Sequence, residues 1–412
     1  MIRTLFQNTS FIRSRNQLQF YLSTMSEINL TTPKVEEENV KTANGRLAES
    51  EKRPEYKWKK AKKMAAMISF SGKDYIGMQR NAGFKTIEGE FLAALSRAGI
   101  IDPEWEEIPQ KGFFQRASRT DKGVSALKMV VSLKMAEEEG MVEKVNAELP
   151  TDIKLQAVVR VTKNFNCKSA ADARTYLYVL PTFAFSPATE IISEDWRCEP
   201  DTIANVNSVL KEFIGSRYFH NYTSGKLPLE PSSQRFIHEF ECGEPFIKDG
   251  YEWCIIRVKG QSFMLHQIRK MIGMALGIVR GHTDLAALEQ TWGMDRIDIP
   301  RAPGLGLVLE EVHYDRYNKR YGSDGIHDTL SWEKVEDQVE TFKQDIVFAD
   351  IFQTEIETKS MFEWMAVLPM HKFEPRHFEE DGRQSPLAIA KANVEREQGK
   401  NGVKVDEDEE DE

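Results

Sequence analysis

The chain has 412 residues, of which 41% are hydrophobic and 29% are charged, as is typical of a soluble globular protein with polar additions. Its apolar runs all fall short of the roughly 18 residues that a transmembrane helix needs, so no membrane span is predicted. The net charge is −10, but the first 320 residues sum to +4 and the last 92 to −14, so only the body of the chain is suited to bind a polyanion.

The first 60 residues precede the predicted folded region. Residues 1–25 are basic and hydroxyl-rich with no acid, which predicts a mitochondrial presequence; the alternative is an ordinary disordered N-terminus. Met25 offers a second start that would omit this segment. Residues 26–60 predict a disordered basic linker. A basic cluster between Lys52 and Lys63 indicates a nuclear import signal, an RNA-contacting edge or a merely solvated run.

Residues 61–165 predict a first α+β half. Ile87, Phe91 and Leu95 recur at helical spacing after Thr86, and Gly99 can end that helix. Apolar segments rich in β-branched and aromatic residues predict strands at 64–70, 111–118, 126–135 and 155–162.

Residues 166–318 predict a second α+β half with a similar order of elements. Residues 173–180 alternate with period two, which predicts a strand with one face in water. A helix is expected at 201–215, with Gly215 as its C-cap. Further elements are expected as strands at 235–242 and 252–259, a long apolar helix at 261–280 and a late strand at 305–313. Strands grouped with helices, without strict alternation, indicate the α+β class with mainly antiparallel sheets.

The end of the chain differs in composition from both halves. Residues 319–396 predict a helical extension of mixed charge, and residues 397–412 predict a disordered acidic tail. The four cysteines form no C-x-x-C pair, so the sequence predicts buried or half-buried thiols in a reducing compartment and no metal site.

The segment most informative about function is R-A-S-R-T-D-K-G-V-S-A at 116–126, which places Asp121 among two arginines and a lysine between two apolar strands. A lone acid in a short loop is often a turn former, and Asp121-Lys122-Gly123 would suit a plain hairpin. The alternative is a catalytic carboxylate held among cations. The residues alone leave both interpretations open.

Residues 119–126, R-T-D-K-G-V-S-A, closely resemble the catalytic loop of the TruA class of tRNA pseudouridine synthases. Further matches follow in the family's order at 70–80, 173–178, 260–273 and 304–309, so the resemblance covers about residues 63–318. Residues 219–225 and 266–273 are similar to the eukaryotic branch. Ser118 and the run 122–125 depart from many bacterial members, which leaves target positions and oligomeric state open.

The resemblance implies a reaction centred on Asp121. Pseudouridine forms when the N1–C1′ glycosidic bond breaks, the base rotates and C5 joins C1′, so the reaction needs no cofactor. A carboxylate can attack C1′ or assist deprotonation of the sugar. By resemblance, Arg269 is the partner whose guanidinium stabilises the ionised carboxylate and fixes its rotamer.

The resemblance also assigns supporting roles. Tyr176 is expected to stack on the target uracil and to act as a general base at C2′; the alternative is a core tyrosine in an amphipathic strand. Tyr178 lies on the same strand face and is the residue that could be mistaken for it. A uridine inside a stem must be flipped out, and Arg119 resembles the arginine that fills the vacated space. Arg174 and His266 are candidates for contacts with phosphate or base.

The expected activity is isomerisation of uridine in the anticodon-stem region of tRNA, with small nuclear RNA and mRNA as further substrates, in a central RNA-binding cleft between the two halves. The expected location is mitochondrial and nuclear. One alternative is a non-catalytic RNA-binding or RNA-folding protein on the same scaffold. A methyltransferase, a zinc deaminase or a P-loop enzyme would show a Gly-rich cofactor loop, H-x-E with P-C-x-x-C, or G-x-x-x-x-G-K-[ST], and the sequence contains none of these motifs.

Overall fold

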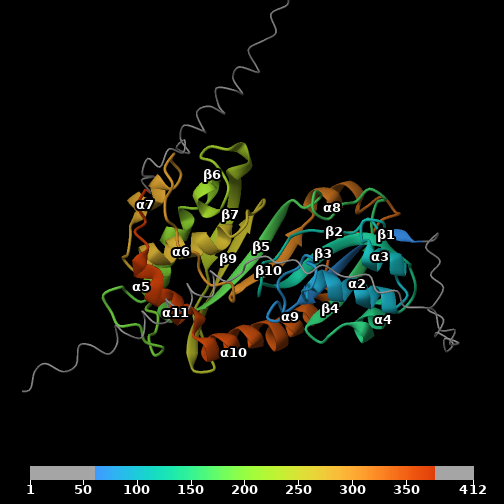
Figure 1. The fold of residues 1–412 in the computed structure, drawn as a ribbon, viewed down its shortest axis with the longest axis horizontal. Coiled ribbons are helices and arrows are strands. Elements are labelled where there is room, and N and C mark those ends of the chain that lie inside the picture. The colour runs from blue at the N-terminus through green and yellow to red at the C-terminus, as the bar shows by residue number, and fades with distance from the viewer. Residues whose placement is uncertain (1–60, 376–412) are drawn as a thin grey trace, which may run out of the picture. The chain divides into compact units, whose positions relative to one another are not determined.

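A computed structural model describes residues 61–375 (Figure 1). The predicted presequence, the linker at 26–60 and the acidic tail lie outside the described residues, as does the last part of the helical extension. The strands are β1 (Lys62–Phe70), β2 (Gln115–Arg116), β3 (Ser125–Met135), β4 (Ile153–Arg160), β5 (Ala173–Pro181), β6 (Gly215–Tyr218), β7 (Gln234–Cys242), β8 (Phe246–Lys248), β9 (Tyr251–Gly260) and β10 (Leu307–His313). The helices are α2 (Ile87–Arg97), α3 (Pro103–Glu107), α4 (Met141–Glu148), α5 (Pro200–Lys211), α6 (Gln267–Val279), α7 (Leu285–Gln290), α8 (Asp315–Tyr321), α9 (Glu336–Phe342), α10 (Ala349–Thr358) and α11 (Ser360–Val367).

The strands form a single 10-stranded sheet in the order β4-β1-β3-β10-β5-β9-β7-β6, with β2 beside β3 and β8 beside β9. The pairing of β10 with β3 is parallel, and the other pairings are antiparallel. The α+β class and the mainly antiparallel sheet are therefore confirmed. The two predicted halves share one sheet, because β10, the last strand of the second half, lies between β3 and β5.

The central strand β5 is buried along its whole length, so the prediction that one of its faces meets water is wrong. Its alternation of side chains reflects polar groups that are satisfied inside the protein. On the polar face, for example, Arg174 donates to the carbonyl of Ala117 at 3.1 Å and Tyr178 donates to the carbonyl of Pro303 at 2.8 Å. On β5, the alternation of polar and apolar residues therefore indicates a buried strand whose polar side chains have hydrogen-bond partners inside the protein.

Three other predicted boundaries differ from the structure. Helix α5 ends at Lys211, and Gly215, expected as its C-cap, has φ +101° and opens β6 opposite Ile237. The strand expected at 111–118 is reduced to β2, because Phe113 has φ +56° and the residues around it form turns. Helix α6 begins at Gln267 and not at residue 261, because His266 has φ +62°, outside the helical region.

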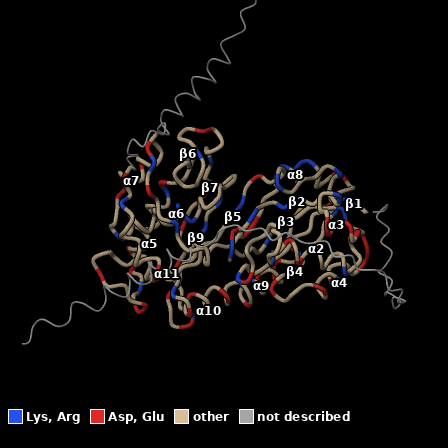
Figure 2. Tube along the Cα trace, in the orientation of Figure 1, with Lys and Arg blue, Asp and Glu red and all other residues tan. Residues whose placement is uncertain are grey.

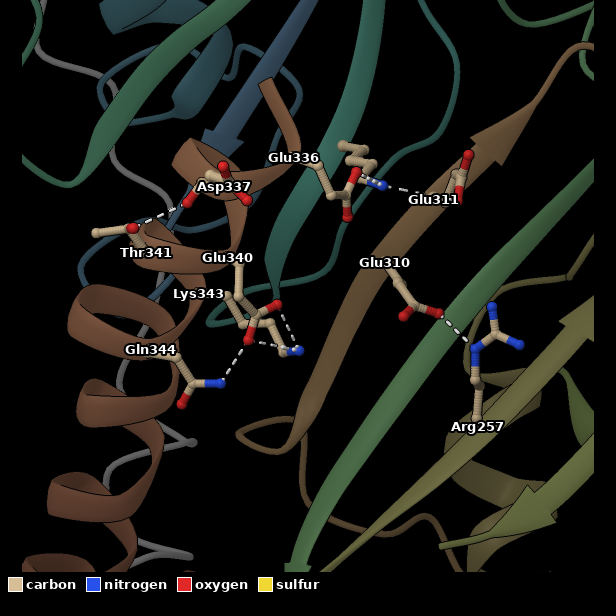
Figure 3. A network of polar contacts seen from close by, with 10 residues as sticks. Arg257, Glu310, Glu311, Glu336, Asp337, Glu340, Thr341, Lys343 and Gln344 are labelled. Atoms are coloured by element: carbon tan, nitrogen blue, oxygen red, sulfur yellow. Dashed lines mark hydrogen bonds and ion pairs between the residues drawn. The ribbon is translucent and has the colours of Figure 1, made fainter. Parts of the chain in front are cut away.

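In the predicted extension, α8 ends at Tyr321, residues 322–332 form turns and irregular structure, and helices follow from residue 333 to Val367, with a π-helical turn at Lys343–Phe348 between α9 and α10. Basic residues gather on α8, whereas α9 and α10 carry an excess of acids (Figure 2). Two contacts attach the acidic helices to the first half. Lys128 on β3 donates to Glu336 at 2.7 Å, and Ser71 donates to Asp350 at 2.6 Å. Lys128 also lies 3.9 Å from Glu311 of β10, and Figure 3 shows Glu336 on the side of Glu311, whereas Glu310 turns towards Arg257.

Two lysines of the predicted basic cluster have structural partners. Lys62 pairs with Glu137, and Lys63 donates from Nζ to the carbonyl oxygen of Phe113 at 2.7 Å. Burial lowers the pKa of Lys63 to about 8. Lys63 is therefore buried and does not present its charge at the surface, whereas Lys62 keeps 41% of its side chain exposed. The import and RNA-contacting roles of the cluster stay predictions, because the rest of it lies outside the described residues. Within residues 61–375, no helix combines the length and the apolar character needed to cross a membrane.

Candidate active site

The loop that carries Asp121 is held against the segment 70–80, one of the motifs singled out in the sequence. Gly123 donates its N–H to the carbonyl of Tyr75 at 3.2 Å. A side chain at Gly72 would lie 2.3 Å from the carbonyl oxygen of Val124, and one at Gly77 would lie 2.5 Å from that of Thr120. Only glycine allows such close contact between backbones. Gly72 and Gly77 therefore let the segment 70–80 pack directly against the Asp121 loop and fix its shape.

Asp121 lies beside the N-terminus of α6 and keeps 29% of its side chain exposed. Its Oδ2 is 3.9 Å from Nη1 of Arg269 and 3.5 Å from Nε2 of His266. The structure thus brings together three of the predicted site residues, from a loop before β3 and from the start of α6. The carboxylate is open to solvent on one side and faces a cation on another.

Arg269 is fixed from the side opposite Asp121. Its Nε donates to the carbonyl oxygen of Ala302 at 2.7 Å, and its own carbonyl accepts from Ala302 N–H at 3.1 Å. A side chain at Gly304 would approach the guanidinium to 3.4 Å. Burial lowers the pKa of Arg269, which nevertheless remains a cation at any physiological pH.

His266 has the left-handed backbone conformation and immediately precedes α6. Its ring also lies 3.2 Å from Nη1 of Arg301. Burial lowers the pKa of His266 below its ordinary value of 6.5, and Asp121 opposes this shift while Arg301 adds to it. The imidazole next to Asp121 is therefore neutral at pH 7.

The two tyrosines of β5 have different partners. The hydroxyl of Tyr176 is 3.0 Å from Oγ of Ser118 in the Asp121 loop, whereas that of Tyr178 donates to the carbonyl of Pro303 at 2.8 Å. The ring of Tyr176 meets Phe263 edge to face at 5.3 Å between centroids. Burial raises the pKa of Tyr176, so its phenol is protonated at neutral pH.

The two remaining predicted residues differ in exposure. Arg119 is exposed on the same loop as Asp121, two residues before it. Arg174 is buried, and its guanidinium donates at 3.1 Å to the carbonyls of Ala117, Lys168 and Gln261. These contacts favour a role for Arg174 in holding the backbone before the loop, and they leave it poorly placed for a phosphate.

Comparison with known proteins decides the family. The pattern of the family described as tRNA pseudouridine synthase matches residues 209–315. The chain is 47% identical over 311 residues to Pseudouridylate synthase 1 homolog of Homo sapiens, covering 74% of this chain and 73% of that protein. It is 46% identical over 316 residues to the Mus musculus protein of the same name, covering 76% and 75%. It is also 33% identical over 381 residues to tRNA pseudouridine synthase 1 of Yarrowia lipolytica, covering 71% of each.

The chain belongs to the TruA class of tRNA pseudouridine synthases, in its eukaryotic branch. It is therefore an isomerase that acts on RNA. The geometry of the site is compatible with this activity. The carboxylate of Asp121 is partly exposed, so a nucleotide can approach it, and the neighbouring Arg269 is held in place by Ala302.

Sequence reasoning overlooked three residues of this pseudouridine synthase site. Ser118 was noticed as a departure from bacterial members, but its contact with Tyr176 was not expected. Phe263 lies inside the matched segment 260–273, and its aromatic side chain could have suggested a contact with Tyr176. Arg301 stands three residues before Gly304 and outside the matched segments, so only the fold brings it to His266.

No group of three or more His, Cys, Asp or Glu side chains suited to a metal ion occurs in the part of the chain that the structure describes. All four cysteines lie in that part, without disulfides; Cys198 is half-buried and the other three are buried. The expectation that the reaction needs no cofactor rests on its chemistry and remains a prediction.

Proposed function

We propose that Asp121 is the carboxylate through which this enzyme converts uridine to pseudouridine in tRNA. The observation that carries the proposal is the position of its Oδ2, which is 3.9 Å from a guanidinium held in place by Ala302, in a partly exposed loop beside Tyr176. A cation in this position stabilises an ionised carboxylate. Ionisation is what either route of catalysis by Asp121 requires.

In the proposed reaction the N1–C1′ bond breaks and a C5–C1′ bond forms after the uracil rotates. Asp121 either attacks C1′ and is later displaced by C5, or assists removal of a proton from C2′ as N1 leaves; in the second route the proton returns to C2′ when C5 joins C1′. In both routes C5 finally loses its proton and N1 gains one, so atoms and electrons balance within the nucleotide. The carboxylate is returned unchanged, as isomerisation requires.

The neighbours of Asp121 are proposed to hold the nucleotide in this position. The ring of Tyr176 stacks on the uracil. Because its phenol is protonated at neutral pH, its hydroxyl can accept a proton from C2′ only by passing its own proton to an ionised base. The nearby Asp121 carboxylate is that base, and Ser118, at 3.0 Å, orients the hydroxyl. The exposed Arg119 fills the space left by the flipped base. The neutral His266 contributes a hydrogen bond to phosphate or base.

The first experiment compares Asp121→Asn with the wild-type enzyme on a tRNA transcript. The substitution keeps the shape of the side chain and removes its charge. We expect no detectable pseudouridine from Asp121→Asn and tRNA binding within about threefold of wild type, because phosphate contacts dominate affinity for RNA. Asp249→Asn, in an exposed turn, is the matched control and should react normally.

The two possible contrary outcomes have different meanings. Turnover by purified Asp121→Asn would reject the nucleophile assignment. A wild-type protein that binds tRNA but leaves uridine unchanged would support the alternative of a non-catalytic RNA-binding protein on the same scaffold.

The proposed substrates extend from the anticodon stem of tRNA to small nuclear RNA and mRNA, as the resemblance to the eukaryotic branch suggests. Pseudouridine mapping of total RNA, with and without this protein, tests each class separately. Sites that disappear with the protein and return with the wild type, but not with Asp121→Asn, are its direct targets.

The proposed location is mitochondrial and nuclear. The composition of residues 1–25 supports mitochondrial import, and Met25 would give a product without this segment. Residues 1–25 fused to a reporter should direct it to mitochondria, and a chain starting at Met25 should be nuclear. Cytosolic retention of the first fusion would contradict the presequence assignment.

A further inference from the structure

An open pocket of about 550 Å³ lies next to the candidate active site and shares two residues with it, Arg269 and Arg301. Arg301 and Pro303 line one side. Thr358, at the end of α10, and Ser360, Glu363 and Trp364 of α11 line the other. Arg269 therefore contacts Asp121 and also lines this cavity, and the helical extension supplies the opposite wall.

Both walls are held in place by named contacts. On the core side, Ala302 exchanges two hydrogen bonds with Arg269, at 2.7 and 3.1 Å. On the extension side, the buried Glu355 accepts from the backbone N–H of Met361 at 2.7 Å and so fixes the start of α11. Lys359, between α10 and α11, is paired with Glu194 at 2.6 Å. A ligand would therefore meet a largely preformed site.

The lining has the chemistry of a nucleotide site. Arg301 is exposed and Arg269 is half-buried, so two cations face one exposed carboxylate, Glu363. Trp364 is half-buried, which leaves part of its indole toward the cavity as a flat apolar surface. An anion alone would not need the indole, and an apolar ligand would not need the guanidinium groups. A phosphate joined to a base uses both.

We propose that this cavity binds a nucleotide that neighbours the target uridine in the RNA, with its base stacked on Trp364 and its phosphate on Arg301. The proposal rests on the proposed function, because the RNA must enter at Asp121 for a neighbouring nucleotide to reach the cavity. The carboxylate of Glu363 is placed to accept from an exocyclic amino group, which favours a base other than uracil.

The first test measures the affinity of full-length enzyme for an anticodon-stem RNA with one reactive uridine, together with single-turnover rates. Trp364→Ala should weaken binding about tenfold, which is within the range of one lost stacking contact, and leave the rate at saturation within about twofold. Trp364→Phe should remain close to wild type, because a phenyl ring still stacks. Trp196→Ala, which removes a half-buried indole outside the cavity lining, is the matched control.

A second arm identifies the stacked base. RNAs that lack one base, at each position flanking the target in turn, keep the phosphates and remove a single stacking partner. For one position, the tenfold difference between wild type and Trp364→Ala should fall below about twofold. The proposal is overturned if the difference is the same for every such RNA, or if Trp364→Phe loses as much affinity as Trp364→Ala.

The third arm uses Arg301→Gln, because an exposed side chain can be replaced without risk to folding even if Trp364→Ala proves unstable. Loss of one phosphate contact should lower the slope of log affinity against log salt by about one, uniformly across sequences. An unchanged slope would remove Arg301 from the site. A failure of the proposed function would be seen in a different measurement, because the wild-type enzyme would then form no pseudouridine. The affinity and salt measurements would still test the cavity in that case.

Discussion

At the scale of single residues, Tyr176 and Tyr178 lie on the same face of β5 and are distinguished by their hydrogen-bond partners. Both side chains are buried on β5, so burial does not distinguish them. The hydroxyl of Tyr176 meets Ser118, three residues before Asp121, whereas that of Tyr178 is bound to Pro303 behind Arg269. Tyr176 is therefore tied to the Asp121 loop, as its proposed stacking role requires, and Tyr178 is tied to the wall of the site behind Arg269.

We expect Tyr176→Phe to bind tRNA almost normally and to turn over more slowly by roughly 10²–10⁴-fold, the usual contribution of a general base. Stacking survives in this variant and the hydroxyl is lost. Tyr176→Leu should lose affinity as well as rate. Single-turnover assays with saturating enzyme separate the two effects.

Tyr178→Phe is the control for that experiment, since it loses a hydrogen bond to Pro303 and no proposed catalytic group. It should lower stability by about 1 kcal/mol, because the carbonyl of the half-buried Pro303 loses its donor, with turnover near wild type. If Tyr178→Phe were the slow variant and Tyr176→Phe the normal one, the roles on this strand would be reversed.

Arg269→Lys tests whether a positive charge alone is sufficient behind Asp121. A lysine keeps the charge but cannot both donate to Ala302 and face Asp121 in a fixed plane. We expect a large loss of rate, roughly 10²-fold, with a smaller loss of tRNA binding, because misplacement of one catalytic group costs about that much. Wild-type turnover by Arg269→Lys would show that Asp121 needs no oriented guanidinium.

At the scale of elements, the junction of α10 and α11 depends on one buried acid. Glu355 accepts from Met361 N–H, and burial raises its pKa from the ordinary 4.5 to about 7. A raised pKa means that the folded state binds this proton more tightly than the unfolded state does. The stabilisation is therefore complete below about pH 4.5 and is lost as the pH rises towards 7.

Glu355→Gln should remove this pH dependence, because an amide oxygen accepts the same hydrogen bond without a buried charge. We expect the variant to exceed wild type by roughly 1–3 kcal/mol in free energy of unfolding at pH 8 and to match it near pH 4.5. Denaturant titrations at the two pH values measure the difference. Glu357→Gln, exposed on the same helix, should show no such trend; equal behaviour of the two variants would contradict the argument.

The sequence predicted the existence of most elements and failed at their boundaries for identifiable reasons. His266 and Phe113 have positive φ values that no propensity anticipates for these residue types, and each moved the boundary of an element. The motifs led to Asp121, Tyr176 and Arg269, which the fold brings to one site. Arg301 and Trp364 could not be predicted to meet, because they belong to a loop and a helix that only the tertiary structure places across one cavity.

At the scale of the whole molecule, the two halves of the core share a sheet and should unfold together. Leu309 on β10 is fully buried and lies opposite Ala126 of β3 and Tyr176 of β5. Leu309→Ala should therefore destabilise both halves by about 2–5 kcal/mol in one transition. Hydrogen exchange at β1 and at β9 should accelerate together. Leu285→Ala, on exposed α7, should cost less than about 0.5 kcal/mol, and loss of protection in one half alone would contradict a shared unit.

The place of β10 between β3 and β5 also governs how the chain can fold while it is being made. The ribosome releases β3 about 180 residues before the strand that pairs with it on that side. Until Leu307–His313 emerges, β3 and β5 each present an unpaired edge of buried, apolar character, which other chains could extend. Pairing partners so distant in sequence also slow folding. We therefore expect the nascent chain to be most prone to aggregation in this interval, and a chain cut short before β10 to aggregate even though it contains Asp121, Tyr176 and Arg269.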